Sequence, residues 1–331
     1  MTDVAPSGDG APMPAHRPAV PSRGGFAHPA LFYRDMREYL RGTVPFILGG
    51  HEAGEPVAVA VPGARLDLLR DAVRAKAPGA AAAAEWIDMS DAGRNPGRII
   101  PHVLRAFADR HSRARVRIIG EPIWPGRSAT EYPACLQHEA LINLAFEDRG
   151  ATILCPYDVT GLGRDAVRDA YATHPVIVDR DGERVSGDYA PDRVIQACNR
   201  PLPEPARADT RRFDLDSVSE IRVLVCRRAE AFGLPPARVG DLELAVNELA
   251  VNSAVHGGGT GLLRIWHADG QVVCEVRDSG RITDPLVGRR PAGMSSHGGR
   301  GVLMVNHLAD LVRMHTGPDG TAVRVYFRLP G

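Results

Sequence analysis

One predicted helix constrains this chain more than any other segment of its sequence. Residues 241–259 read DLELAVNELAVNSAVHGGG, and their apolar residues recur at spacings of three and four, as on the buried face of an amphipathic helix. The glycines at 257–259 predict where the helix ends. The predicted buried face consists of Leu242, Ala245, Val246, Leu249, Ala250 and Val255.

Polar residues form a second stripe on the same helix. Glu248 and Asn252 are four residues apart and share one helical face, with Asn247 and His256 beside them. An amide oxygen can ligate a hard cation such as Mg²⁺, and a carboxylate can accept a proton from an attacking hydroxyl group or water. The pattern is short, and for this stretch alone a solvated polar face is an equally good interpretation.

Three downstream segments strengthen the functional interpretation. Asp278 and Gly280 follow an apolar run predicted as a strand, and a buried aspartate there needs a partner, which an exocyclic amine such as that of adenine would provide. Gly299 and Gly301 open an apolar helical run, and amides at a helix N-terminus form an anion site. Residues 319–329 predict a turn and an alternating strand.

In this order and spacing, the segments resemble the GHKL ATPase superfamily with its Bergerat fold, an α+β two-layer sandwich. Within it, the short form is similar to the anti-sigma factor serine kinases. The resemblance covers about residues 211–331 and implies that Glu248 activates a serine of a partner protein while Asn252 holds Mg²⁺. The residues implied to bind ATP and Mg²⁺ are Asn252, Ser253, His256, Asp278, Gly280, Gly299, Arg300, Gly301 and Thr321.

The segment 281–297 is irregular and is predicted to form a lid over ATP. The first glycine box usually reads D-x-G-x-G, but here its last position is Ile282, so the family pattern does not determine the shape of the lid. Arg289, Arg290 and Arg300 could reach phosphates. Lys76 is the only lysine of the chain, so any ATP site must work without a P-loop lysine.

The first part of the chain has a different pattern. Residues 1–24 are rich in Pro, Gly and Ala and predict a disordered tail. From 25 to 200, strand-like and helix-like segments alternate, which predicts an α/β domain with a mostly parallel sheet. A proline-rich linker, 201–210, separates it from the ATPase-like domain, 211–331.

Ligands of such sheets bind beyond the carboxyl ends of the strands, which is where we expect a sensory pocket. Its candidate residues are His28, Glu121, His138, Cys155, Tyr157, Asp158 and His174. A metal site made of His, Cys and carboxylate side chains is conceivable, but the spacing carries no ligand signature. The favoured alternative places His138 and Glu139 on a solvated helix and makes Cys155 a small buried apolar residue.

Six segments of this part resemble the MEDS domain (methanogen/methylotroph, DcmR sensory) over about residues 28–176. In order, they are HPALFYRD, GEPVAVAV, FADRHSRARVRIIGEPIWPGRS, QHEALINLAF, LCPYD and ATHP. The resemblance implies a signal-sensing module with a RecA-like core that lacks a P-loop, and it does not name the small-molecule signal.

The charge and composition of the chain argue against several classes of protein. The formal net charge is zero, so we expect no direct nucleic-acid partner. Five scattered cysteines argue against a disulfide framework, and without a signal peptide or a long apolar run we expect a cytoplasmic protein with no membrane contact.

Together these features predict a sensor-coupled anti-sigma regulator, which binds a sigma factor and phosphorylates an anti-sigma factor antagonist on Ser or Thr. A sensor histidine kinase would need a helical hairpin with a phospho-accepting histidine, whereas residues 201–210 contain prolines and no histidine. A third hypothesis, a binding module that ATP switches and that has no transferase activity, is not excluded by the sequence. The family resemblance suggests a homodimer of ATPase domains, although helix 217–232 fits equally well in an intramolecular core.

Overall fold

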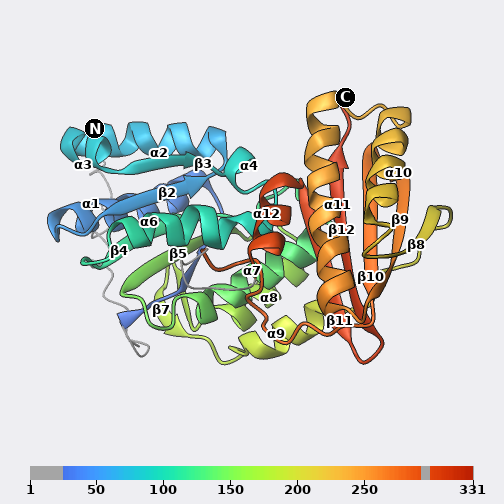
Figure 1. The fold of residues 1–331 in the computed structure, drawn as a ribbon. Coiled ribbons are helices and arrows are strands. Elements are labelled where there is room, and N and C mark those ends of the chain that lie inside the picture. Colours follow the sequence, from blue (N-terminus) through green and yellow to red (C-terminus); the bar gives the residue numbers. More distant parts are fainter. Residues whose placement is uncertain (1–24, 292–298, 331) are drawn as a thin grey trace, which may run out of the picture.

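The computed structural model describes residues 25–291 and 299–330, and the predicted tail, 1–24, lies outside them. The described chain forms an α/β half and an α+β half that lie side by side (Figure 1). This arrangement confirms the predicted fold class, with a mostly parallel sheet in the first half and an antiparallel sheet covered by helices in the second.

The first half is built on a seven-stranded sheet with the order β3-β2-β4-β5-β1-β6-β7. Neighbouring strands run parallel except for the antiparallel pair β6 and β7. The strands are β1 (Pro29–Tyr33), β2 (Val57–Val61), β3 (Glu85–Asp88), β4 (Val116–Gly120), β5 (Ala151–Asp158), β6 (Val176–Asp179) and β7 (Gly182–Val185).

Helices cover both faces of this sheet (Figure 1). They are α1 (Met36–Glu52), α2 (Gly63–Lys76), α3 (Pro78–Ala83), α4 (Met89–Ala92), α5 (Pro96–Arg98), the π-helix η2 (Ile99–Leu104), α6 (Arg105–Arg110), α7 (Tyr132–Ala145), α8 (Arg164–Thr173) and α9 (Pro191–Cys198). Strands β1, β2 and β5 are almost wholly buried, as is usual for a parallel sheet covered on both faces.

The second half is a five-stranded antiparallel sheet with the order β11-β12-β10-β9-β8. Its elements are β8 (Asp209–Asp214), α10 (Val218–Ala231), α11 (Pro236–His256), β9 (Thr260–Ala268), β10 (Gln271–Asp278), α12 (Arg300–Leu308), β11 (Leu311–Gly317) and β12 (Gly320–Arg328). The three helices share one apolar core with this sheet. All helices of the described residues are too short or too polar to span a bilayer.

Helix α11 contains the predicted polar stripe, and it begins at Pro236 rather than at 241. A proline at the first helical position has no N–H to leave unsatisfied, so it starts the helix readily. Val255 was expected on the buried face, but its side chain is 57% exposed. Ser253 takes the inward position instead, because it continues the stripe formed by Val246, Leu249 and Ala250.

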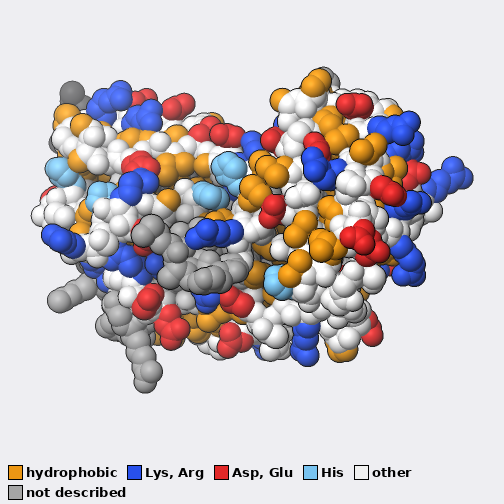
Figure 2. All heavy atoms as spheres, viewed as in Figure 1, with side chains coloured by type: hydrophobic (Ala, Val, Ile, Leu, Met, Phe, Trp, Pro, Cys, Tyr) orange, Lys and Arg blue, Asp and Glu red, His pale blue; other side chains and the backbone are white. Residues whose placement is uncertain are grey.

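The two halves are joined by buried polar contacts and by apolar packing. Asn95 Nδ2 donates a hydrogen bond to the backbone oxygen of Asn306 at 2.8 Å, and Asn199 Nδ2 donates to the backbone oxygen of Thr316 at 2.8 Å. Leu286, from the predicted lid, belongs to the hydrophobic core of the first half. Figure 2 shows the surface hollowed at the top between the halves, above the region where they meet.

Candidate functional site

A pocket of about 550 Å³ lies between α11, the lid segment, α12 and the sheet of the second half. This volume falls within the usual range for small-molecule and cofactor sites. Its wall includes all nine residues implied to bind ATP and Mg²⁺: Asn252, Ser253, His256, Asp278, Gly280, Gly299, Arg300, Gly301 and Thr321. The apolar part of the wall is formed by Leu249, Val276, Ile282, Val287, Val302 and Val323.

The Asp278 carboxylate is held in place at the end of β10. Ser253 Oγ donates a hydrogen bond to Asp278 Oδ2 at 2.6 Å, and the Gly280 N–H donates to Asp278 Oδ1 at 2.8 Å. Thr321 Oγ1 donates to the backbone oxygen of Gly280 at 2.9 Å, which ties β12 to this turn. The carboxylate therefore has a set orientation at the pocket wall, where it can accept a further hydrogen bond from a ligand.

Glu248 and Asn252 meet the start of α12 at Gly301. A Cβ atom on Gly301 would lie 2.8 Å from Glu248 Oε2 and 3.0 Å from Asn252 Nδ2, so any other residue here would displace these two side chains. Gly299, with φ of 84°, is the N-cap residue of the helix. The first amides of a helix have no intrahelical acceptor, so this end of α12 can bind an anion inside the pocket.

The three arginines proposed for phosphate contacts have different positions. Arg300 lines the pocket. Arg289 does not: its guanidinium is buried against the first half and donates to the backbone oxygen of Pro96 at 3.4 Å and to Gln137 Oε1 at 3.2 Å. Arg290 pairs with Asp284 at 2.7 Å. The expectation for Arg289 is therefore wrong, because its segment folds onto the first half; the rest of the predicted lid, 292–297, lies outside the described residues.

The candidates for a sensory pocket do not form one site. Glu121 and Asp158 lie at the carboxyl ends of β4 and β5, near Tyr33 and Arg65. Arg65 Nη1 contacts Glu121 Oε1, and Tyr33 donates a hydrogen bond to the same oxygen at 3.4 Å. Burial raises the pKa of Glu121 to about 8. Sequence reasoning missed Tyr33, the last residue of β1, and Arg65, which lies in the first turn of α2 just beyond the carboxyl end of β2.

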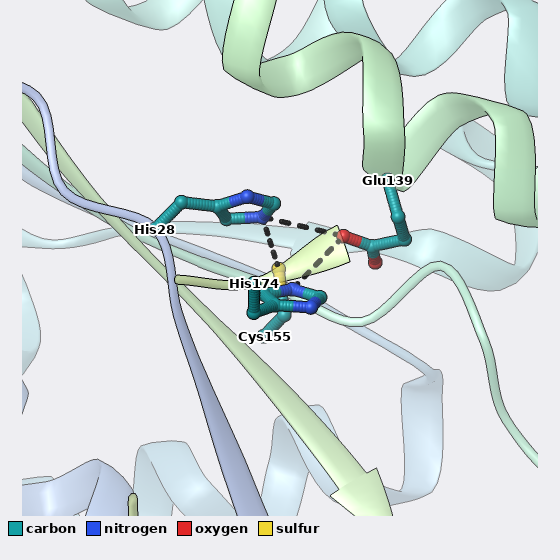
Figure 3. A group of neighbouring side chains, drawn as sticks. All are labelled: His28, Glu139, Cys155 and His174. Atoms are coloured by element: carbon teal, nitrogen blue, oxygen red, sulfur yellow. Dashed lines mark hydrogen bonds and ion pairs between the residues drawn. The ribbon is translucent and has the colours of Figure 1, made fainter. Parts of the chain in front are cut away.

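The remaining candidates lie elsewhere in the sheet. His28 precedes β1 and His174 precedes β6, so both lie at the amino ends of strands, with Cys155 inside β5. These three and Glu139 of α7 form a buried cluster, which we call the His–Cys–Glu cluster (Figure 3). The ring of Tyr157 lies 5.4 Å from that of His174.

The favoured alternative for α7, a solvated helix, is wrong. His138 is 1% exposed and Glu139 is fully buried. The helix is enclosed because one side packs into the core of the first half, and Ala134 packs against Val273 and Tyr326 of the second. Burial lowers the pKa of His138 to about 3 and that of His28 to about 4.

Comparisons with known families identify the two halves. The family described as MEDS, MEthanogen/methylotroph, DcmR Sensory domain, matches residues 27–175. The family described as histidine kinase-like ATPase domain matches residues 212–327. The chain joins a MEDS domain to a histidine kinase-like ATPase domain. Both family resemblances seen in the sequence are thereby confirmed, and we use these two domain names from here on.

Solved structures share only a limited likeness with the whole chain. The RsbU and RsbW domains of Rv1364c from Mycobacterium tuberculosis match at 20% identity and a TM-score of 0.29, over 38% of this chain and 32% of that one. The Acinetobacter baumannii histidine kinase AdeS matches at 13% identity and a TM-score of 0.22, over 38% of this chain and 70% of AdeS. The chain thus spans about a third of the Rv1364c structure. No curated protein matches it.

Proposed function

We propose that this protein is a sensor-coupled anti-sigma regulator. Its ATPase domain binds ATP with Mg²⁺, binds a sigma factor, and phosphorylates an anti-sigma factor antagonist on Ser or Thr. The observation that carries this proposal is the gathering of nine residues from α11, β10, α12 and β12 around one pocket, with Glu248 and Asn252 meeting the start of α12. We place the MEDS domain at 25–200, the linker at 201–210 and the ATPase domain at 211–331.

Each polar group has a role that suits its chemistry. The oriented Asp278 carboxylate accepts a hydrogen bond from the exocyclic amine of adenine, and the amides that open α12 bind phosphate oxygens. Bound Mg²⁺ would neutralise charge on the phosphates, and the Asn252 amide oxygen would be one of its ligands. Glu248 accepts the proton of the serine hydroxyl as that oxygen attacks.

The lid supports the coupling of sensor to ATPase. Arg281, Ile282 and Val287 line the ATP pocket, while Leu286 and Arg289 of the same segment are buried against the MEDS domain. Arg289 contacts Gln137 of α7, two residues before Glu139. A ligand-dependent shift of α7 would therefore be transmitted to the wall of the ATP pocket.

Calorimetry with ATP, with and without Mg²⁺, tests the nucleotide part on the full chain and on Asn252→Ala. We expect magnesium-dependent binding by the wild type and its loss in the variant, because the variant lacks the amide oxygen. Wild-type protein that binds no ATP would contradict the proposal.

Labelled ATP and a candidate antagonist protein test the transfer step. We expect label on a serine or threonine of the antagonist. In Glu248→Gln, the rate of this transfer should fall by a factor of about 10² to 10⁴, the usual contribution of a general base. Binding of ATP and of the sigma factor should be unchanged. Undiminished transfer would remove Glu248 from the role of base. Acid-labile label on a histidine would instead indicate a histidine kinase, and ATP-dependent sigma binding without transfer would indicate an ATP-switched module.

The proposed homodimer is tested by sedimentation of the full chain. Helix α10 buries Ile221, Val225 and Ala229 in the core of its own domain, and Val223 remains 55% exposed. A monomer at all concentrations would contradict the dimer without affecting the ATP site.

A further inference from the structure

The His–Cys–Glu cluster has the geometry of a metal site. Glu139 Oε2 lies 3.3 Å from His28 Nε2 and 3.3 Å from His174 Nε2, and Cys155 Sγ lies 3.4 Å from His28 Nε2. All four potential ligand atoms lie within 4.8 Å of one another. Ligands at the corners of a zinc tetrahedron are about 3.3 to 3.6 Å apart, given Zn–N bonds of about 2.0 Å and Zn–S bonds of about 2.3 Å.

Hydrogen bonds around the cluster show which nitrogen of each histidine carries a proton. His174 Nδ1 lies 3.0 Å from the backbone oxygen of Ala170, which can only accept, so Nδ1 donates. Asn143 Nδ2 donates to three backbone oxygens, which leaves Asn143 Oδ1 as the acceptor for His28 Nδ1 at 3.2 Å. In the neutral rings, both Nε2 atoms therefore present lone pairs to the cluster.

These lone pairs face a carboxylate, which can only accept hydrogen bonds when it is ionised. Within the part of the chain that the structure describes, both oxygens of Glu139 and Nε2 of His174 are buried without a hydrogen-bond partner. Acceptors facing one another at 3.3 Å repel unless a cation or a proton lies between them. Protonating both rings would leave a net positive charge in a fully buried site, which is costly. One divalent cation satisfies all the acceptors at once.

We propose that the MEDS domain binds one tetrahedral Zn²⁺ ion through His28 Nε2, His174 Nε2, Cys155 Sγ and a Glu139 oxygen (Figure 3). On binding, the Cys155 thiol releases its proton to solvent and becomes a thiolate. The two positive charges of the ion are then balanced by the thiolate and the carboxylate, so the buried site is neutral overall. Imidazole nitrogen, thiolate sulfur and carboxylate oxygen are all established zinc ligands.

The surroundings suit a bound ion. The Nδ1 hydrogen bonds to Asn143 and to the Ala170 carbonyl fix both rings, as the outer partners of zinc-binding histidines do. His28 and Asn143 also line a surface pocket of about 740 Å³, so the buried cluster lies next to this pocket. The proposal does not depend on the chemistry of the ATPase domain.

Cobalt substitution of the full chain tests the proposal. After removal of metal with a chelator, we expect one Co²⁺ per chain, an intense thiolate-to-cobalt absorption band, and loss of that band when Zn²⁺ is added, because Zn²⁺ binds more tightly. Cys155→Ala should abolish the band. The matched control is Cys135→Ala, which removes a buried cysteine of the same domain outside the cluster and should keep it.

Thermal unfolding gives a second readout that needs no variant. Zn²⁺ should raise the melting temperature of the wild type, because it binds the folded chain. A wild type with neither a thiolate band nor a zinc-dependent rise in melting temperature would overturn the proposal. A band that survives in Cys155→Ala and disappears in Cys135→Ala would overturn it as well. Unaltered ATP binding by the metal-free chain would show that the metal site and the ATP pocket work independently.

Discussion

At the scale of single residues, the buried carboxyl group of Glu121 makes stability depend on pH. Its pKa is raised by burial from 4.5 to about 8, although Arg65 lies beside it. Between these values the folded chain keeps a proton that the unfolded chain releases, so the free energy of unfolding falls as the pH rises, by at most about 1.4 kcal/mol per pH unit. We expect Glu121→Gln to flatten this slope, measured by urea unfolding from pH 5 to 9.

Glu52→Gln is the matched control, since Glu52 is an exposed carboxyl group at the end of α1. This variant should keep the wild-type slope. A Glu121→Gln variant whose slope equals that of the wild type would show that Glu121 is already ionised in the folded chain.

At the scale of elements, the contact between α11 and α12 shapes the pocket that we propose binds ATP. Gly301→Ala would place a Cβ atom 2.8 Å from Glu248 Oε2, so the Glu248 and Asn252 side chains must move. We expect the Kd for ATP with Mg²⁺ to rise roughly tenfold, a loss of about 1.4 kcal/mol, measured by calorimetry.

Gly240→Ala on α11 is the control for this change, because Gly240 is exposed and a Cβ atom there meets nothing within 4 Å. It should leave the Kd unchanged and raise the free energy of unfolding by about 1 kcal/mol, since alanine favours the helix. Equal ATP binding by both variants would show that the close approach at Gly301 does not shape the site.

At the scale of the whole molecule, the lid ties the two domains together. Arg289→Ala removes the buried arginine side chain together with its hydrogen bonds to the Pro96 carbonyl and to the half-buried Gln137 side chain. We expect the free energy of unfolding to fall by about 2 kcal/mol and the two domains to unfold in separate transitions, measured by calorimetric melting. Arg290→Ala, which removes only the exposed pair with Asp284, should melt like the wild type. A single wild-type transition in Arg289→Ala would contradict this coupling.

The sequence by itself determined the features that depend on local geometry. Glu248 and Asn252 share a face because four residues make about one turn of a helix. The alternation of strands and helices was enough to predict a parallel sheet, and the order of the glycine-rich turns was enough to predict the ATPase domain that the family comparison confirms. The periodic pattern also predicted the buried face of α11 correctly except at Val255, which lies in the last turn of the helix and is exposed.

Only the tertiary structure decided which distant residues meet. His28, Glu139, Cys155 and His174 come from four separate segments of the chain, and they meet in space because of the order of strands in the sheet, which no local pattern encodes. The burial of Glu139 depends on residues that α7 meets within its own domain, His28, Cys155 and His174, whereas the burial of Arg289 depends on the docking of its segment onto the other domain. The periodicity of apolar residues predicts the one buried face of an element. It could not predict the burial of α7 and of the lid segment, because both are packed between the two domains.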